Sequence, residues 1–75
     1  MSTAKITSRT VSNQAVAGFL AATYGWATGR AERVASIATA FESKAEATEG
    51  GFVQVTYLPE TTSYLVEDHT GRDIS

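Results

Sequence analysis

The sequence contains no cysteine, only one histidine and only one proline among its 75 residues. A chain without cysteine has no disulfide, no thiolate-bound zinc and no cysteine nucleophile. A single histidine cannot build a histidine-rich metal site, and His69 falls in a predicted turn without the G-x-S-x-G motif of a serine hydrolase. We therefore expect a protein with no metal, no cofactor and no enzymatic activity.

Long hydrophobic runs are also lacking. The longest run, residues 15–22, is interrupted by Gly18 and is far shorter than the roughly 20 residues of a transmembrane helix. No apolar stretch follows the N-terminal residues as it does in a secretory signal peptide. We expect a cytoplasmic protein that contacts no membrane. Hydrophobic residues make up 43% and charged residues 19%, which is typical of one folded domain spanning residues 1–75.

Charge is sparse and unevenly distributed. Residues 1–41 carry four basic residues against one acidic residue, a net charge of +3. Residues 42–75 carry two basic residues against seven acidic residues, a net charge of −5. This asymmetry indicates either two faces with different partners or a head-to-tail contact between copies, and ordinary solubilising charge is the alternative.

The first two thirds of the chain predict an N-terminal arm followed by a helical hairpin. Residues 1–11 favour an arm or short strand whose inner face carries Ile6. Residues 12–49 show helical periodicity in two stretches. We expect the first helix to begin at a cap on Ser12 or Asn13 and to end at Gly25. The second helix is predicted to begin near Thr28 and to run to residues 50–51, with Phe19 and Phe41 of the two helices in the core.

Residues 52–75 predict an antiparallel sheet, because the apolar period changes from 3.6 to 2 after Gly51. Strands at 52–58 and 63–68 are joined by a proline turn. A second turn is expected at 69–72, where Asp68 accepts hydrogen bonds from the turn backbone and Gly71 adopts the left-handed conformation. This turn leads to a short third strand at 73–75. The predicted register pairs Leu58 with Ser63, Tyr57 with Tyr64, Val55 with Val66 and Val53 with Asp68. The predicted fold class is α+β: two helices, an αα-hairpin, packed on a small antiparallel β-hairpin or meander.

Two sets of residues are candidates for binding. The protein-binding candidates are an aromatic pair and the acidic residues of the C-terminal half: Tyr24, Trp26, Glu60, Glu67, Asp68 and Asp73. Tyrosine and tryptophan are favoured at interface hot spots, although this pair could equally seal the edge of the core. The acidic residues could occupy a basic site on a partner.

The alternative candidates are residues that could bind nucleic acid or another anion: Lys5, Thr7, Arg9, Arg30 and Arg33. Residues 4–45, with an alternating basic strand followed by two helices, resemble the ribbon-helix-helix repressors. That resemblance implies that the strand reads the major groove of DNA and that the start of the second helix holds a phosphate. The chain departs from that pattern in its polar Ser8 and Thr10, its additional acidic sheet and its acidic net charge.

The composition favours a small non-enzymatic protein-binding module, an adaptor or inhibitor, such as those that phages direct at host or defence machinery. A DNA-binding regulator and a subunit of a larger assembly are the alternatives. A protein is the expected partner, ahead of nucleic acid, and a homodimer remains an open alternative.

Overall fold

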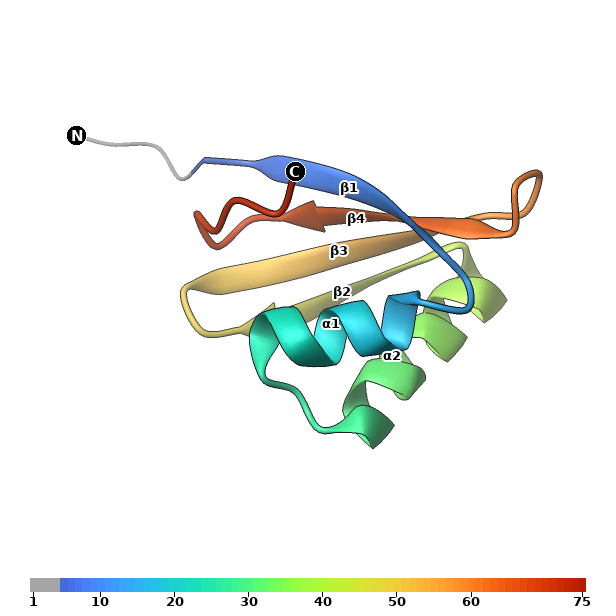
Figure 1. The fold of residues 1–75 in the computed structure, drawn as a ribbon, viewed down its shortest axis with the longest axis horizontal. Helices are drawn as coiled ribbons and strands as arrows, with labels where there is room; N and C mark the ends of the chain where they lie inside the picture. Colours follow the sequence, from blue (N-terminus) through green and yellow to red (C-terminus); the bar gives the residue numbers. More distant parts are fainter. Residues whose placement is uncertain (1–4) are drawn as a thin grey trace.

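The computed structural model describes residues 5–75, and the first four residues of the predicted arm lie outside that range. Along the chain the elements are β1 (Thr7–Ser12), α1 (Val16–Tyr24), α2 (Thr28–Phe41), β2 (Ser43–Thr48), β3 (Gly51–Leu58) and β4 (Ser63–Asp68). The strands form one antiparallel sheet in the order β1-β4-β3-β2, and α1 and α2 form a layer beside it (Figure 1). The predicted α+β fold class is confirmed.

The β3–β4 hairpin has the register that the sequence predicted. Val53 lies opposite Asp68, Val55 opposite Val66, Tyr57 opposite Tyr64 and Leu58 opposite Ser63. The rings of Tyr57 and Tyr64 are 5.1 Å apart between centroids. The register is strongly specified because a shift by one residue would turn the valines away from the helices.

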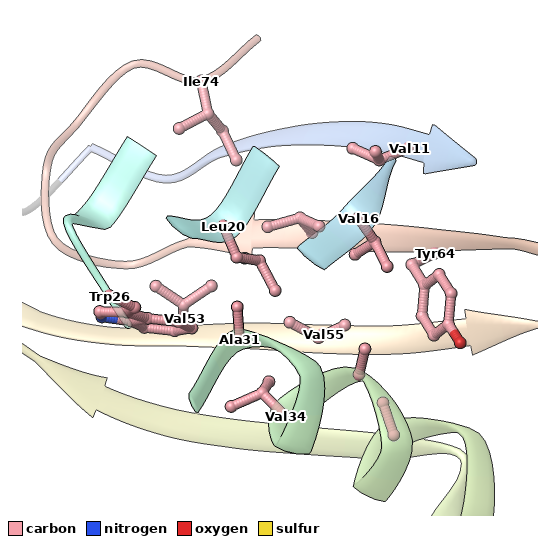
Figure 2. Close-up of a cluster of buried hydrophobic side chains, with 13 residues drawn as sticks. Val11, Val16, Leu20, Trp26, Ala31, Val34, Val53, Val55, Tyr64 and Ile74 are labelled. Carbon is pink, nitrogen blue, oxygen red and sulfur yellow. The ribbon is translucent and has the colours of Figure 1, made fainter. Parts of the chain in front are cut away.

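The core lies between the helices and one face of the sheet (Figure 2). Its buried hydrophobic residues come from every element except β2: Val11, Val16, Leu20, Trp26, Ala31, Val34, Ala35, Ala38, Val53, Val55, Tyr64, Val66 and Ile74. Many of these residues are alanine or valine, so the helices approach the sheet closely. Leu20 is fully buried, which places it at the centre of this layer.

The predicted helical hairpin at 12–49 is too long, because α2 ends at Phe41. Glu42 has a φ of 73°, which stops the helix, and residues 43–48 form β2 instead. The residues of β2 favour a helix locally, but pairing with β3 decides their conformation. Phe41 was expected in the core and is 73% exposed, because the chain turns away at this residue.

The ends of the chain also differ from expectation. In β1, Thr7 and Val11 face the core, whereas Ile6, the expected inner residue, is 58% exposed. The predicted strand at 73–75 does not form, because β4 is already paired on both sides, with β1 and β3. The predicted turn at 69–72 does form, with Gly71 at a φ of 91°.

The helix ends follow the sequence only in part. Gly25 ends α1 in the left-handed conformation, with a φ of 69°, as predicted. The residues at the N-caps are Ala15 and Ala27, and neither makes a side-chain capping bond. The predicted caps at Ser12, Asn13 and Thr28 are therefore wrong.

Candidate functional site

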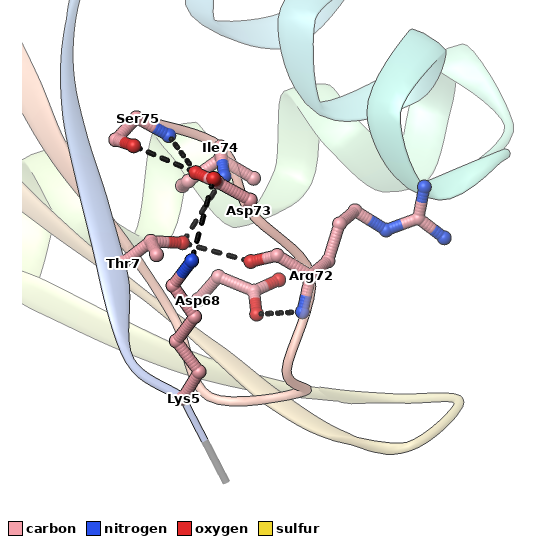
Figure 3. Close-up of polar contacts among 7 residues, drawn as sticks. All are labelled: Lys5, Thr7, Asp68, Arg72, Asp73, Ile74 and Ser75. Atoms are coloured by element: carbon pink, nitrogen blue, oxygen red, sulfur yellow. Dashed lines mark hydrogen bonds and ion pairs between the residues drawn. The ribbon is translucent and has the colours of Figure 1, made fainter.

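Asp68, the last residue of β4, is a fully buried carboxylate. It accepts hydrogen bonds from the Tyr24 hydroxyl at 2.6 Å and from the backbone N–H groups of Thr70 at 2.9 Å and Arg72 at 3.0 Å. The Thr70 hydroxyl donates as well, at 2.9 Å. Figure 3 shows the bond from Arg72. Hydrogen-bond donors surround the charge, which is what a carboxylate needs in a buried position.

These bonds set the protonation of the Asp68–Tyr24 pair. Burial by itself raises the pKa of Asp68, but the hydrogen bonds from Tyr24, Thr70 and Arg72 outweigh it, so the pKa lies below its ordinary value. Burial, followed by the bond to Asp68, raises the pKa of Tyr24. The pair is therefore a neutral phenol that donates a hydrogen bond to an ionised carboxylate.

Trp26 is buried beside this pair, at 6% exposure. Its ring is stacked 5.2 Å from that of Tyr24, and its Nε1 donates to the Thr48 hydroxyl at 3.1 Å. The structure thus brings Tyr24, Trp26 and Asp68 together, with Trp26 and Asp68 buried and Tyr24 partly buried. Of the two roles considered for the aromatic pair, sealing the core is the one that this geometry shows for Trp26.

The other predicted acidic residues lie apart from each other. Glu60 is exposed in the β3–β4 turn, and Glu67 lies on the opposite face of the sheet from Asp68. Asp73 is bonded to Lys5 at 3.5 Å and to the backbone and side chain of Ser75 (Figure 3). No single acidic site forms from this set within residues 5–75.

Arg30, a predicted anion-binding residue, is engaged in internal contacts. Its Nε donates to Glu46 at 2.8 Å, its Nη2 donates to the carbonyl of Ala47 at 2.6 Å, and its guanidinium lies over the Trp26 ring. Lys44 approaches the same Glu46 carboxylate at 3.4 Å. Burial raises the pKa of Glu46, but the bonds from Arg30 and Lys44 lower it by more, so the net shift is downward.

The remaining candidates for nucleic-acid binding do not form one row. Thr7 is buried, and its hydroxyl donates to the carbonyl of Arg72 and accepts the N–H of Ile74. Arg9 lies on the helix side of β1, over the Phe19 ring at 5.5 Å. Arg33 is exposed on α2, and Lys5 is bonded to Asp73.

The face of the sheet that points away from the helices is a second candidate surface, which we call the outer sheet face. Strand alternation places these residues on it: Ser8, Thr10, Ser12, Ser43, Ala45, Ala47, Phe52, Gln54, Thr56, Leu58, Ser63, Leu65 and Glu67. Glu67 is the only charged side chain among them. Phe52 is 39% exposed, and its ring stacks on that of His69 at 4.3 Å between centroids.

Sequence reasoning missed Phe52 as a surface aromatic residue. The alternation of the predicted strand could have indicated this position, since it places Phe52 on the same face as the polar residues Gln54 and Thr56. The small residues of β2 were missed as well, because that segment was assigned to a helix.

Neither a pocket nor a group of three or more metal-binding side chains occurs in the part of the chain that the structure describes. None of the helices in this part is long and apolar enough to span a membrane.

The molecule is an α+β domain with a two-helix layer on a four-stranded antiparallel sheet of order β1-β4-β3-β2. No known protein family, curated protein or solved structure matches this chain.

Proposed function

We propose that this protein is a small non-enzymatic protein-binding module, an adaptor or inhibitor, and that it binds its partner through the outer sheet face. The observation that carries the proposal is the composition of that face. An exposed side of an antiparallel sheet usually carries several charged residues among its polar ones. This side instead carries uncharged polar residues, the apolar residues Ala45, Ala47, Phe52, Leu58 and Leu65, and a single glutamate.

The centre of a protein interface is depleted in charge and enriched in aromatic residues. Thr56 and Leu65 lie opposite each other in the middle of the outer sheet face, and neither is charged. Phe52, stacked on His69, supplies an aromatic ring at one end of β3. A weakly charged surface of this kind needs little desolvation of charge when a partner covers it.

The partner is expected to be weakly charged at the centre and basic at the rim. Glu60 lies in the turn at one end of the hairpin, and Glu49 lies in the β2–β3 turn at the other end. Rim charges of this sign favour encounter with a positively charged partner.

The test is affinity capture from a lysate of the native cells at low salt, using the wild type and two variants. Thr56→Arg places a cation at the centre of the outer sheet face, and Ser36→Arg places the same group on the exposed side of α2. A partner that the wild type and Ser36→Arg retain and Thr56→Arg loses supports the proposal. Equal capture by all three proteins, or no capture by any, contradicts it.

A further inference from the structure

The two edges of the sheet, β1 and β2, differ in how their backbone groups are satisfied. In an antiparallel pair, residues bonded to the partner strand alternate with residues whose N–H and C=O point away. The N–H of Tyr57 donates to the carbonyl of Glu42 at 2.8 Å, which sets the pattern between β2 and β3. The backbone groups of Ser43, Ala45 and Ala47 therefore point to the free edge of β2.

Side chains obstruct this β2 edge. Lys44 Nζ donates to the carbonyl of Ala45 at 2.9 Å, and Arg30 Nη2 donates to the carbonyl of Ala47 at 2.6 Å. The Glu46 carboxylate holds both cations in place. An incoming strand would have to displace this network, and charged side chains are a common protection of sheet edges.

The β1 edge has no such protection. The N–H of Asn13 donates to the carbonyl of Thr62 at 3.2 Å, so the odd-numbered residues of β1 are the ones whose backbone bonds to β4. The backbone N–H and C=O groups of Ser8, Thr10 and Ser12 therefore point to the free edge. The carbonyl of Ser12 already accepts the N–H of Ala15 at 3.0 Å. Within residues 5–75, no hydrogen bond reaches the outward N–H or C=O of Ser8 or Thr10.

The helix beside this edge carries no charged side chain of its own. Arg9 of β1 lies over Phe19 of α1, which places α1 next to β1. The nine residues of α1 include no acidic or basic side chain, and its exposed residues Gly18 and Ala22 are small. By contrast, α2 carries Arg30, Glu32 and Arg33. A second molecule approaching β1 would therefore meet unsatisfied backbone groups and a helix whose only neighbouring charge on β1 is the Arg9 guanidinium over Phe19.

We propose that a second copy of this chain occupies the β1 edge, with the two β1 strands paired antiparallel about a two-fold axis in a continuous eight-stranded sheet. A two-fold contact between identical surfaces is the most common form of oligomer. Edge pairing satisfies donors and acceptors reciprocally, and the small side chains of Ser8 and Thr10 allow close approach. The inference rests on the edge of the sheet and is independent of a partner on the outer sheet face.

The unsatisfied backbone groups and the side chains of β1 favour one register for pairing with a second copy. A two-fold axis at Arg9 would set two guanidinium groups opposite each other, which is destabilising. An axis at Thr10 would pair Ser8 with Ser12, whose carbonyl is already bonded. An axis at Ser8 pairs Ser8 with its own copy and Ile6 with Thr10, and it covers Ile6, which is 58% exposed.

Analytical ultracentrifugation over a concentration series tests the dimer with two matched proline variants. Thr10→Pro removes an outward N–H from β1, and Ala45→Pro removes an outward N–H from β2. Each leaves the hydrogen bonds to the neighbouring strand in place, which is the edge position that tolerates proline. We expect a dimer for the wild type and for Ala45→Pro, and dimerisation weakened by about tenfold or more for Thr10→Pro.

Amide hydrogen exchange of the wild type gives a second measurement that does not depend on a variant folding. In the dimer the amides of Ser8 and Thr10 gain protection as concentration rises, joining those of Thr7, Arg9 and Val11, which are bonded to β4. A wild type that stays monomeric at the highest concentration, or a dimer in which Ser8 and Thr10 exchange rapidly, overturns the proposal. Protection of these amides only after another protein or peptide is added overturns it too.

Loss of the dimer and loss of the outer-face partner can be told apart. Thr56→Arg lies on a central strand and is expected to leave the dimer intact, while Thr10→Pro is expected to leave partner capture intact.

Discussion

Asp68 shows how a single buried charge organises one end of this molecule. Its carboxylate binds the backbone N–H groups of Thr70 and Arg72 and so closes the turn that follows β4. The same carboxylate accepts the Tyr24 hydroxyl from the end of α1. One side chain therefore connects the sheet, the helix layer and the C-terminal segment.

The first prediction concerns the substitution Asp68→Asn. The amide keeps the size of the side chain, but its NH₂ group replaces one carboxylate oxygen and cannot accept the hydrogen bonds that this oxygen accepted. We expect the free energy of unfolding to fall by about 3 kcal/mol, since bonds to a buried charge are lost and donors are left without acceptors. Urea denaturation measures the change. The neighbouring Glu67→Gln, on the outer sheet face, should change it by less than about 0.5 kcal/mol.

The second prediction concerns pH. The pKa of Asp68 is lower in the folded protein than its ordinary value, so its contribution to stability is complete above the pKa of the unfolded chain, about 3.9. That contribution is lost as pH falls through the folded pKa. Glu46 and Asp73, whose pKa values are also lowered, act in the same direction.

Unfolding free energies of the wild type and Asp68→Asn, measured from pH 6 downward, isolate the contribution of Asp68. We expect the two curves to converge as the solution becomes acidic. A constant difference between them at every pH would show that folding does not shift the pKa of Asp68, which would contradict the prediction.

At the scale of whole elements, the junction between α2 and β2 is the point where local preference and fold disagree. Glu42 connects the two elements with a φ of 73° and a ψ of −34°, a conformation that a residue with a Cβ rarely adopts. Its carbonyl is bonded by the N–H of Tyr57, so the pairing with β3 begins at the residue that ends the helix.

The third prediction is that Glu42→Gly stabilises the protein. Glycine removes the steric strain of this backbone conformation, which raises the free energy of unfolding by about 1 to 2 kcal/mol. It also makes the unfolded chain more flexible, which lowers the free energy of unfolding by up to about 1 kcal/mol. We expect a net gain of about 0.5 to 1 kcal/mol, measured by urea denaturation. The matched change Glu32→Gly, inside α2 and exposed, should lower stability by about 1 kcal/mol. A loss at both positions would contradict the strain at Glu42.

At the scale of the whole molecule, the two ends of the chain close the core together. Ile74 is buried at 4% exposure. The Thr7 hydroxyl accepts a hydrogen bond from the N–H of Ile74 and donates one to the carbonyl of Arg72 (Figure 3). The contact joins residues 67 positions apart in the sequence. It fixes the C-terminal segment against β1 without adding a strand.

The fourth prediction compares Ile74→Ala with Phe41→Ala. Ile74→Ala removes buried methyl groups and leaves a cavity, so we expect a loss of about 2 to 4 kcal/mol. Phe41→Ala removes a larger side chain, but that side chain is 73% exposed, and the loss should stay below about 0.5 kcal/mol. Thermal or urea unfolding of dilute samples measures both changes. A larger loss at Phe41 would contradict the end of α2 at that residue.

The parts of this fold that could be predicted from sequence are local ones. Alternating residues and a proline turn specify the β3–β4 register, and Gly25 and Gly71 take the left-handed conformations expected of them. The candidate protein-binding residues were found by type, but their burial was not. The sequence left Trp26 open between the core and a surface, and Asp68 was assigned to a binding surface. Both are interior because distant segments converge on them.

The sequence by itself determined the α+β class, the two helices and the central hairpin, because these depend on periodicity and turn residues within a few positions. Only the tertiary structure decided that residues 43–48 join the sheet, that β1 pairs with β4, and which side of each edge strand is exposed. The reason is physical. Strand pairing and burial are settled by contacts between distant segments, and for a segment such as residues 43–48 those contacts outweigh local helix propensity.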